Sequence, residues 1–502
     1  MIEPVFEKIS FDQIIDCEKE QIKVNCKTGV LSEDVEKVLS VCPCSFVSSG
    51  EVGQGALKYG GKITFYLTYL DKEGSVKKCE CGSEFNGEIK VDCEDMGAKA
   101  SIKSVVEKTE YDLSSAYLNV SSIVSVCAKL FCKNTAGALI GGEGLLVDGV
   151  EQTFLSSLGK RWVNYPMEEE FELSFPVEEV LFHRAEAVIT ATQCGVGSII
   201  VDGQVLLSLV LLQNNEKKDI IKENRVLPFR MEIECEDAMP SLLALARVKE
   251  KSLKTDVGVD QTDGTSVVKA YLTLQFEGEA FTNLNAVYAR DLFSTKNHLD
   301  IIAQNCTGYT PREQRAYDFL ISGVSLSEEI PIGAVVIAAC QEDAHVLSVR
   351  CEKNGVEISG TIDATVYLKD AEGKVFTRKV ETSFSKHIDG EFDQNDQIEA
   401  IITAFKGTAR VVSATELEIE CQAFITLHFT CPYQIKLITE VKELGEKKEE
   451  DCAISVYLGM EGEEKFALAK RLNVCPDALV SINQDLQFPL AGDERIVVYR
   501  QK

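Results

Sequence analysis

The stretch Gly61-Lys-Ile-Thr-Phe-Tyr-Leu-Thr-Tyr-Leu-Asp71 decides the fold of this chain, because its pattern occurs three times. In each copy a glycine is followed by apolar residues at every second position, and a polar turn comes next. The second copy starts at Gly203 and the third at Gly360. Strict alternation places the apolar side chains on one face of a β-strand. Each copy therefore predicts a core strand and a hairpin turn.

A second marker supports the repeat. The pattern Leu-Ser-x-x-Val or Leu-Ser-x-x-Ile starts at Leu31, Leu173 and Leu326. The first two copies of both markers lie 142 residues apart, and the next interval is 153 residues for the leucine and 157 for the glycine. A repeat of this length is a whole domain and not one turn of a solenoid. In each unit a return strand carries one phenylalanine: Phe85, Phe229 and Phe384.

The repeated unit predicts the fold class. Four or more alternating segments per unit indicate antiparallel sheets packed as a sandwich or partial barrel, with few helices. We expect a mainly β chain with three such domains in tandem, followed by a small C-terminal β-α-α-β module. The expected segments are an N-terminal arm (1–27), β-domain 1 with its connector (28–165), β-domain 2 with its connector (166–322), β-domain 3 (323–440), a charged linker (441–451) and the module (452–502).

The net charge of −28, from 52 Lys and Arg against 80 Asp and Glu, limits the possible partners. Nucleic-acid binding needs a basic surface, and an anionic membrane surface repels an acidic protein. The first residues show no basic and apolar leader. No apolar run reaches the length of about 18 residues that a membrane span needs. We therefore expect a cytoplasmic protein with no nucleic-acid partner and no membrane insertion.

The eighteen cysteines are the other compositional feature. In a large chain without a leader, most are expected to be reduced and buried as small apolar side chains. The close pairs Cys42-x-Cys44 and Cys79-x-Cys81 lack the Cys-x-x-Cys spacing of structural zinc sites. A zinc site is therefore the less favoured alternative, and cross-links between chains in an oxidising setting are a third.

The sequence brings no catalytic group together. The five histidines lie far apart, and no Gly-x-Ser-x-Gly motif occurs. The glycine-rich run from Gly55 to Lys62 leads into a strand instead of a helix, which argues against a phosphate loop. The acidic clusters after the return strands suit solvated turns better than calcium sites. We expect no enzyme, no cofactor and no metal, although carboxylate pairs remote in sequence stay open.

The segment from Gly462 to Asn483 predicts two short helices, the second starting at Pro476, and resembles a LysM module. Glu463 and Glu464 stand where that family has Asp-Thr, a departure that weakens the case for glycan binding. LysM modules bind N-acetylglucosamine polymers through the loops after the first strand and after the second helix. The resemblance implies a groove for protein or glycan at Gly462, Glu463, Glu464, Phe466, Asn483, Asp485 and Leu486.

The repeated units resemble the SPOCS domain, a β-rich domain of spore-coat proteins in clostridia and relatives. The glycine-started strands, the Asp-x-Glu-Gly hairpins at Asp71 and Asp370, and the segment from Tyr288 to Ser294 carry the resemblance. SPOCS units followed by LysM are the arrangement of a clostridial-type coat morphogenetic protein. The resemblance implies a non-enzymatic scaffold or adaptor of the mother cell, at the forespore surface and spore coat. The implied partners are spore coat proteins, among them the ATPase of the coat's basal layer. The alternative is a binder of N-acetylglucosamine glycan in cortex or cell-wall peptidoglycan.

Overall fold

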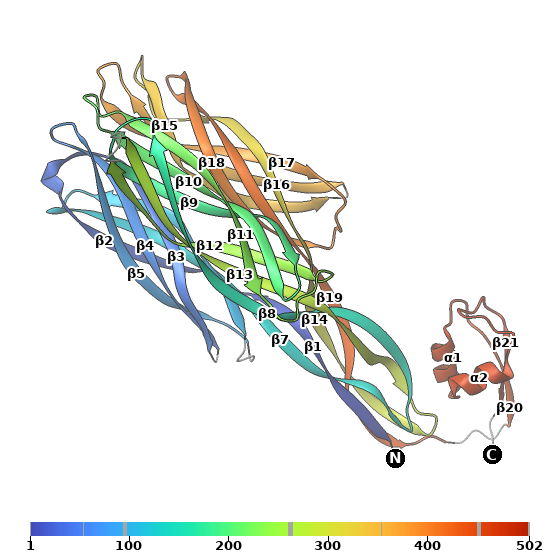
Figure 1. Cartoon of the computed structure of the whole chain (residues 1–502). Coiled ribbons are helices and arrows are strands. Elements are labelled where there is room, and N and C mark those ends of the chain that lie inside the picture. The colour runs from blue at the N-terminus through green and yellow to red at the C-terminus, as the bar shows by residue number, and fades with distance from the viewer. Residues whose placement is uncertain are drawn as a thin grey trace.

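The computed structural model describes residues 2–53, 55–93, 98–259, 265–352, 354–448 and 453–499 (Figure 1). The chain is mainly β, as the alternation predicts, and its sheets are antiparallel. In the part of the chain that the structure describes, the α-helices are two short ones near the C-terminus. The expectation of a mainly β fold with few helices is confirmed.

Unit 1 contains the first copy of the repeated glycine strand. After a 3-10 turn at Ser32–Asp34, three consecutive strands form an antiparallel meander. This meander faces a second sheet, in which the long last strand of the unit pairs with each of the other strands. The strands are β1 (Glu3–Asp16), β2 (Glu20–Leu31), β3 (Val35–Gly53), β4 (Ala56–Asp71), β5 (Val76–Lys90), β6 (Lys99–Asp112) and β7 (Tyr117–Glu143). The N-terminal arm is thus part of the unit, since β1 and β2 both pair with β7.

Units 2 and 3 repeat this order, with one long strand in place of β1 and β2. The meander β9-β10-β11 faces the sheet β12-β13-β8, and β15-β16-β17 faces β14-β19-β18. The strands of unit 2 are β8 (Leu146–Leu173), β9 (Val177–Cys194), β10 (Ser198–Gln213), β11 (Ile220–Glu234), β12 (Leu243–Val259) and β13 (Ser266–Phe293). Those of unit 3 are β14 (Asn297–Leu326), β15 (Val335–Glu352), β16 (Gly355–Lys369), β17 (Val375–Asp389), β18 (Gln397–Ser413) and β19 (Glu416–Glu446).

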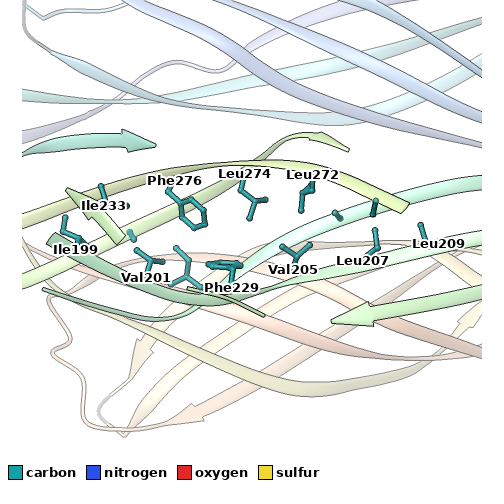
Figure 2. Close-up of a cluster of buried hydrophobic side chains, with 14 of the residues drawn as sticks. Ile199, Val201, Val205, Leu207, Leu209, Phe229, Ile233, Leu272, Leu274 and Phe276 are labelled. Atoms are coloured by element: carbon teal, nitrogen blue, oxygen red, sulfur yellow. The ribbon is translucent and has the colours of Figure 1, made fainter. Parts of the chain in front are cut away.

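The alternating residues of the repeated strand form the core between the two sheets, as predicted. Figure 2 shows this for unit 2, where Val205, Leu207 and Leu209 of β10 face Leu272 and Leu274 of β13. Burial of such side chains contributes about 1.5–3 kcal/mol each to folding. The turn after the strand is also as expected, since Asp71 Oδ1 accepts hydrogen bonds from the backbone N–H groups of Glu73 (3.0 Å) and Ser75 (2.8 Å).

The repeated glycine and the repeated phenylalanine are partners across two strands. The register pairs Gly61 with Phe85, Gly203 with Phe229, and Gly360 with Phe384. A Cβ atom added to Gly203 would lie 2.3 Å from the carbonyl oxygen of Val188 and 2.5 Å from Cζ of Phe229. The glycine therefore lets the phenylalanine ring cross its backbone, which explains why both residues recur together.

The segments expected as connectors between domains are strands. Four of the five expected boundaries fall inside strands: 27/28 in β2, 165/166 in β8, 322/323 in β14 and 440/441 in β19. The fifth, 451/452, lies outside the described residues. The structure places the divisions between units at the turns after Glu143 and after Phe293 instead. The long strands pair as ribbons, β8 with β13 and β14 with β19, and continue beyond the sandwiches. The charged linker lies partly in β19, and its residues 449–451 are outside the described residues.

The ribbons pack side by side into what we call the stalk, residues 3–13, 132–154, 284–309 and 432–446. Its interior holds Ile9, Phe154, Tyr288 and Leu437 from different units. At the other end the meanders share a second core, around Tyr367, whose hydroxyl lies 2.7 Å from Ser40 Oγ and 2.6 Å from Thr68 Oγ1. The units thus surround a common centre in a threefold-like arrangement and do not lie in a row (Figure 1).

We expect Gly203→Ala to destabilise the chain by about 1–3 kcal/mol, because the new methyl group overlaps a backbone carbonyl and a buried ring. Chemical denaturation measures the effect. Gly137→Ala is the matched control, since Gly137 also lies in a strand but has no atom within 4 Å of the position of the added Cβ. Equal stability of the two variants would contradict the role assigned to the glycine.

Candidate functional site

The C-terminal module has the predicted β-α-α-β order. It consists of β20 (Ile454–Leu458), α1 (Lys465–Leu472), α2 (Pro476–Ile482) and β21 (Arg495–Tyr499), with β20 and β21 paired in an antiparallel sheet. Asn473 ends α1 in the left-handed conformation with φ 55°. Pro476 begins α2, where its missing N–H costs nothing. The helices cover one face of the sheet and bury Ile496 and Val498.

The structure gives several of the predicted groove residues internal roles. Glu463 accepts hydrogen bonds from Arg471 Nε (2.7 Å) and Nη2 (2.8 Å), and this pairing lowers the pKa of its carboxyl group. Asn483 joins α2 to β21: its side chain donates to the carbonyl oxygens of Leu479 and Val497, both at 2.8 Å. Gly462 forms the turn before α1 with φ 78°. These groups hold the module together.

The remaining predicted residues divide between core and surface. Phe466 and Leu486 pack against the module's core, whereas Glu464 and Asp485 are exposed. The backbone carbonyl of Glu464 accepts the N–H of Leu468 (3.0 Å) in the first turn of α1. The exposed part of the predicted groove therefore consists mainly of carboxylates. Such a surface suits a protein partner with basic groups better than a neutral sugar chain.

The module docks on the end of the stalk. The ring of Phe466 meets the ring of Phe293 edge to face, with centroids 5.3 Å apart. Lys470 Nζ lies 2.5 Å from Asp291 Oδ1, and the side-chain amide of Asn473 donates to the carbonyl oxygen of Thr295 (2.9 Å). Lys447 Nζ, at the end of unit 3, donates to the side-chain oxygen of Asn473 (2.7 Å). Helix α1 is thus fixed to the turn between β13 and β14.

We expect Phe293→Ala to release the module. Phe293 is 4% exposed, and loss of a buried aromatic ring weakens docking by about 3–5 kcal/mol. A module of this size has little core of its own, so undocking raises amide hydrogen exchange in residues 465–472. Tyr499→Ala is the control, because Tyr499 lies in the same module and is 59% exposed. The docking described here is refuted if exchange in α1 is unchanged by Phe293→Ala.

A cavity of about 470 Å³ lies where the sandwiches meet the stalk, and residues of every unit line it. Strands at corresponding places in the units supply charged side chains. Glu399 of β18 lies 2.7 Å from Arg247 of β12 and 2.5 Å from Lys103 of β6. One carboxylate therefore pairs with a cation from each of the other two units. We call these three residues the junction triad.

Burial and charge shift the pKa values of the groups at this junction. Burial raises the pKa of Glu399, but Arg247 and Lys103 outweigh this effect and lower the pKa to about 2. Burial lowers the pKa of His428 to about 3, and Arg247 acts in the same direction. His428 is therefore neutral at neutral pH. Lys160, 8% exposed, pairs with Glu277 at 2.8 Å and with Glu279 at 3.6 Å. These charges compensate one another within the protein.

Sequence reasoning missed both the junction and the docking surface of the module. The residues of the junction triad lie in different units, and no local pattern relates them. A usable signal did exist for Phe293, a large apolar residue in a segment expected as a connector between domains. An apolar residue at such a position indicates a contact that the local sequence does not supply.

No protein-family model, curated protein or solved structure matches this chain. Over the described ranges, no helix is long and apolar enough for a bilayer crossing. The same residues contain no group of three or more His, Cys, Asp and Glu placed to hold a metal ion. Several of the cysteines that the structure describes, including Cys340 and Cys421, are buried in the cores as expected.

We expect Glu399→Gln to destabilise the chain by about 2–4 kcal/mol at neutral pH, because two partly buried cations lose their shared carboxylate. The stabilisation depends on pH. The folded pKa is about 2, and an unfolded glutamate has a pKa of about 4.3. The contribution of Glu399 is thus fully present above about pH 4.3 and is lost as pH falls toward 2.

Denaturation midpoints of the parent chain and Glu399→Gln, measured between neutral and acidic pH, test the loss of stability at neutral pH and its dependence on pH. The two chains should converge as Glu399 is protonated. His428 adds a fall in stability below about pH 6.5 in both chains, since the unfolded imidazole takes up a proton that the folded one refuses. Glu110→Gln is the control, because its pair with Lys108 is on the surface. A constant difference between the chains at all pH values would contradict the assignment.

Proposed function

We propose that this chain is a non-enzymatic assembly protein of the spore envelope. The units form one body, and the C-terminal module presents a binding surface for a coat protein at the end of the stalk. The resemblance of the repeats to SPOCS and of the module to LysM supplies the cellular setting. The shared cores and the junction triad support a scaffold whose parts keep fixed positions.

The observation that carries the proposal is the outer face of the module's sheet. Ile454, Val456 and Leu458 alternate along β20 and are 56%, 62% and 59% exposed. Tyr499, which pairs with Ile454, is 59% exposed on the neighbouring strand. The helices cover the opposite face. An apolar sheet face left in water marks a protein interaction surface.

This surface favours a protein partner over glycan. N-acetylglucosamine chains are held by hydrogen bonds to polar groups, and Glu463 and Asn483 of the predicted groove already use theirs internally. The exposed face offers apolar side chains, which suit the hydrophobic centre of a protein interface. The ATPase of the coat's basal layer, which the resemblance implies as a partner, is one of the coat proteins proposed to bind this surface.

We expect the full chain to co-purify spore coat proteins from sporulating cells, and Val456→Glu to lose them, because a carboxylate at the centre of the apolar face opposes burial. Val196→Glu is the control, since Val196 is 79% exposed in the turn between β9 and β10 of unit 2 and is not part of the module. Mass spectrometry identifies the proteins recovered. Pelleting the same chains with purified peptidoglycan tests the alternative. Recovery with peptidoglycan and with no coat protein would favour glycan binding and sink the proposal.

A further inference from the structure

The geometry points to a second binding site: the free edge of β14, from Asp318 to Leu326, takes an extended segment of a partner protein as an added strand. On the face of the sheet that carries Leu320, Ser322, Val324 and Leu326, the partner segment has an apolar side chain opposite each of the three apolar residues. It has a basic side chain opposite Ser322. The inference rests on the proposed assembly function and defines the chemistry of one partner. A peptide strand binds such an edge by backbone hydrogen bonds, and its alternate side chains give specificity.

The backbone of this edge is well fixed and forms no ladder on one side. β14 pairs with β19 along its length, and no strand of the described residues pairs with its other side, although β17 of the facing sheet comes close near Ser325, whose hydroxyl donates to the carbonyl oxygen of Glu381 (2.6 Å). The inward residues Phe319 and Ile321 are 9% and 6% exposed in the core of unit 3. The strand is therefore rigid before binding. Every second residue directs its N–H and C=O groups away from β19, toward the free edge.

The outward side chains of this edge are large and apolar. Leu320 is 69% exposed, Val324 54% and Leu326 79%, although the strand is otherwise packed. Side chains directly across from one another on adjacent strands lie close enough to pack. An apolar residue of the added strand would cover each of them. Binding thus removes apolar surface from water in addition to pairing the backbone.

The other units show that the fold does not require this surface. The first strand of each unit's second sheet has a free edge, namely β2 in unit 1, β8 in unit 2 and β14 in unit 3. The outward residues of β8 include Glu168, Glu170 and Glu172, and those of β2 include Lys23 and Lys27. Charged edges prevent pairing with other chains. Unit 3 has Leu320 and Val324 at outward positions of its free edge instead of charged residues, whereas Leu326 is a copy of the repeated leucine, which is also exposed (37%) at Leu31 of unit 1.

The charge around the edge determines the occupant. Ser322 pairs with Glu420 of β19, which is exposed. Adjacent strands lie about 4.8 Å apart, so a lysine or arginine opposite Ser322 extends across the small serine side chain toward this carboxylate. Glu416 lies on the same face, and so does Glu418, which is paired with Arg410. A second copy of this chain would bring two glutamate rows and two net charges of −28 together, which disfavours self-pairing.

The probe is a labelled peptide, Thr-Val-Thr-Val-Thr-Lys-Thr-Val-Thr, which in antiparallel pairing places valine opposite Leu326, Val324 and Leu320 and lysine opposite Ser322. Fluorescence anisotropy with the full chain measures its affinity. We expect Val324→Lys to weaken binding about tenfold or more, since it adds a charge and removes the central apolar contact. The same peptide with N-methyl groups on alternate residues loses backbone donors and should not bind.

Charge specificity has its own test. A peptide with glutamate in place of the lysine should bind about tenfold more weakly, and Glu420→Gln should abolish this difference. Glu172→Gln on the edge of β8 is the matched control and should leave both affinities unchanged. Circular dichroism shows that each variant is folded. Equal binding of the lysine peptide to the parent chain and Val324→Lys, or of the methylated and unmethylated peptides, would overturn the inference.

Two further outcomes separate this inference from the proposed function. If the chain dimerises in sedimentation experiments and Val324→Lys makes it monomeric, the edge serves a second copy and the partner inferred here is wrong. If coat proteins co-purify normally while the peptide does not bind, the edge fails and the assembly function stands. If the peptide binds but no coat protein is recovered, the edge stands and the proposed function fails.

Discussion

The arrangement of the units depends on one carboxylate shared between two cations. Glu399 pairs with Arg247 and with Lys103, and each of the three side chains comes from a different unit. Near the centre of the molecule these charges are only partly solvated, so each is stable only while the others are in place. The units therefore do not behave as separate domains. Together with the apolar cores in the stalk and around Tyr367, to which every unit contributes, this contact joins the units into one body.

The features that could be predicted from the sequence are those that depend on neighbouring residues along the chain. Alternation along Val205, Leu207 and Leu209 identified a core strand because one sheet face is buried along its whole length. The short helices of the module followed from helical spacing and from Pro476 at a first helical position. The paired recurrence of glycine and phenylalanine was visible, but its cause was not. That cause is a cross-strand contact between Gly203 and Phe229, which only the register reveals.

The features that sequence reasoning missed are long-range. Two of the four stalk segments, 132–154 and 284–309, lie mostly in stretches expected as connectors between domains, and their apolar residues meet partners from other units instead of their own sheet. The junction triad requires knowledge of three separate strands. The predicted groove residues Glu463 and Asn483 were placed correctly in the module, yet a motif does not state whether a polar group faces solvent or a neighbour. In this chain both face neighbours.

The internal repeat allows function to be separated from folding. The three units share the glycine, the phenylalanine and the buried strand, because each sandwich needs them to pack. The fold places no such demand on outward residues, and there the units differ. Unit 2 carries glutamates along its free edge, whereas unit 3 carries Leu320 and Val324. An exposed apolar edge favours aggregation, so its presence in unit 3 supports the partner strand that we infer for that edge.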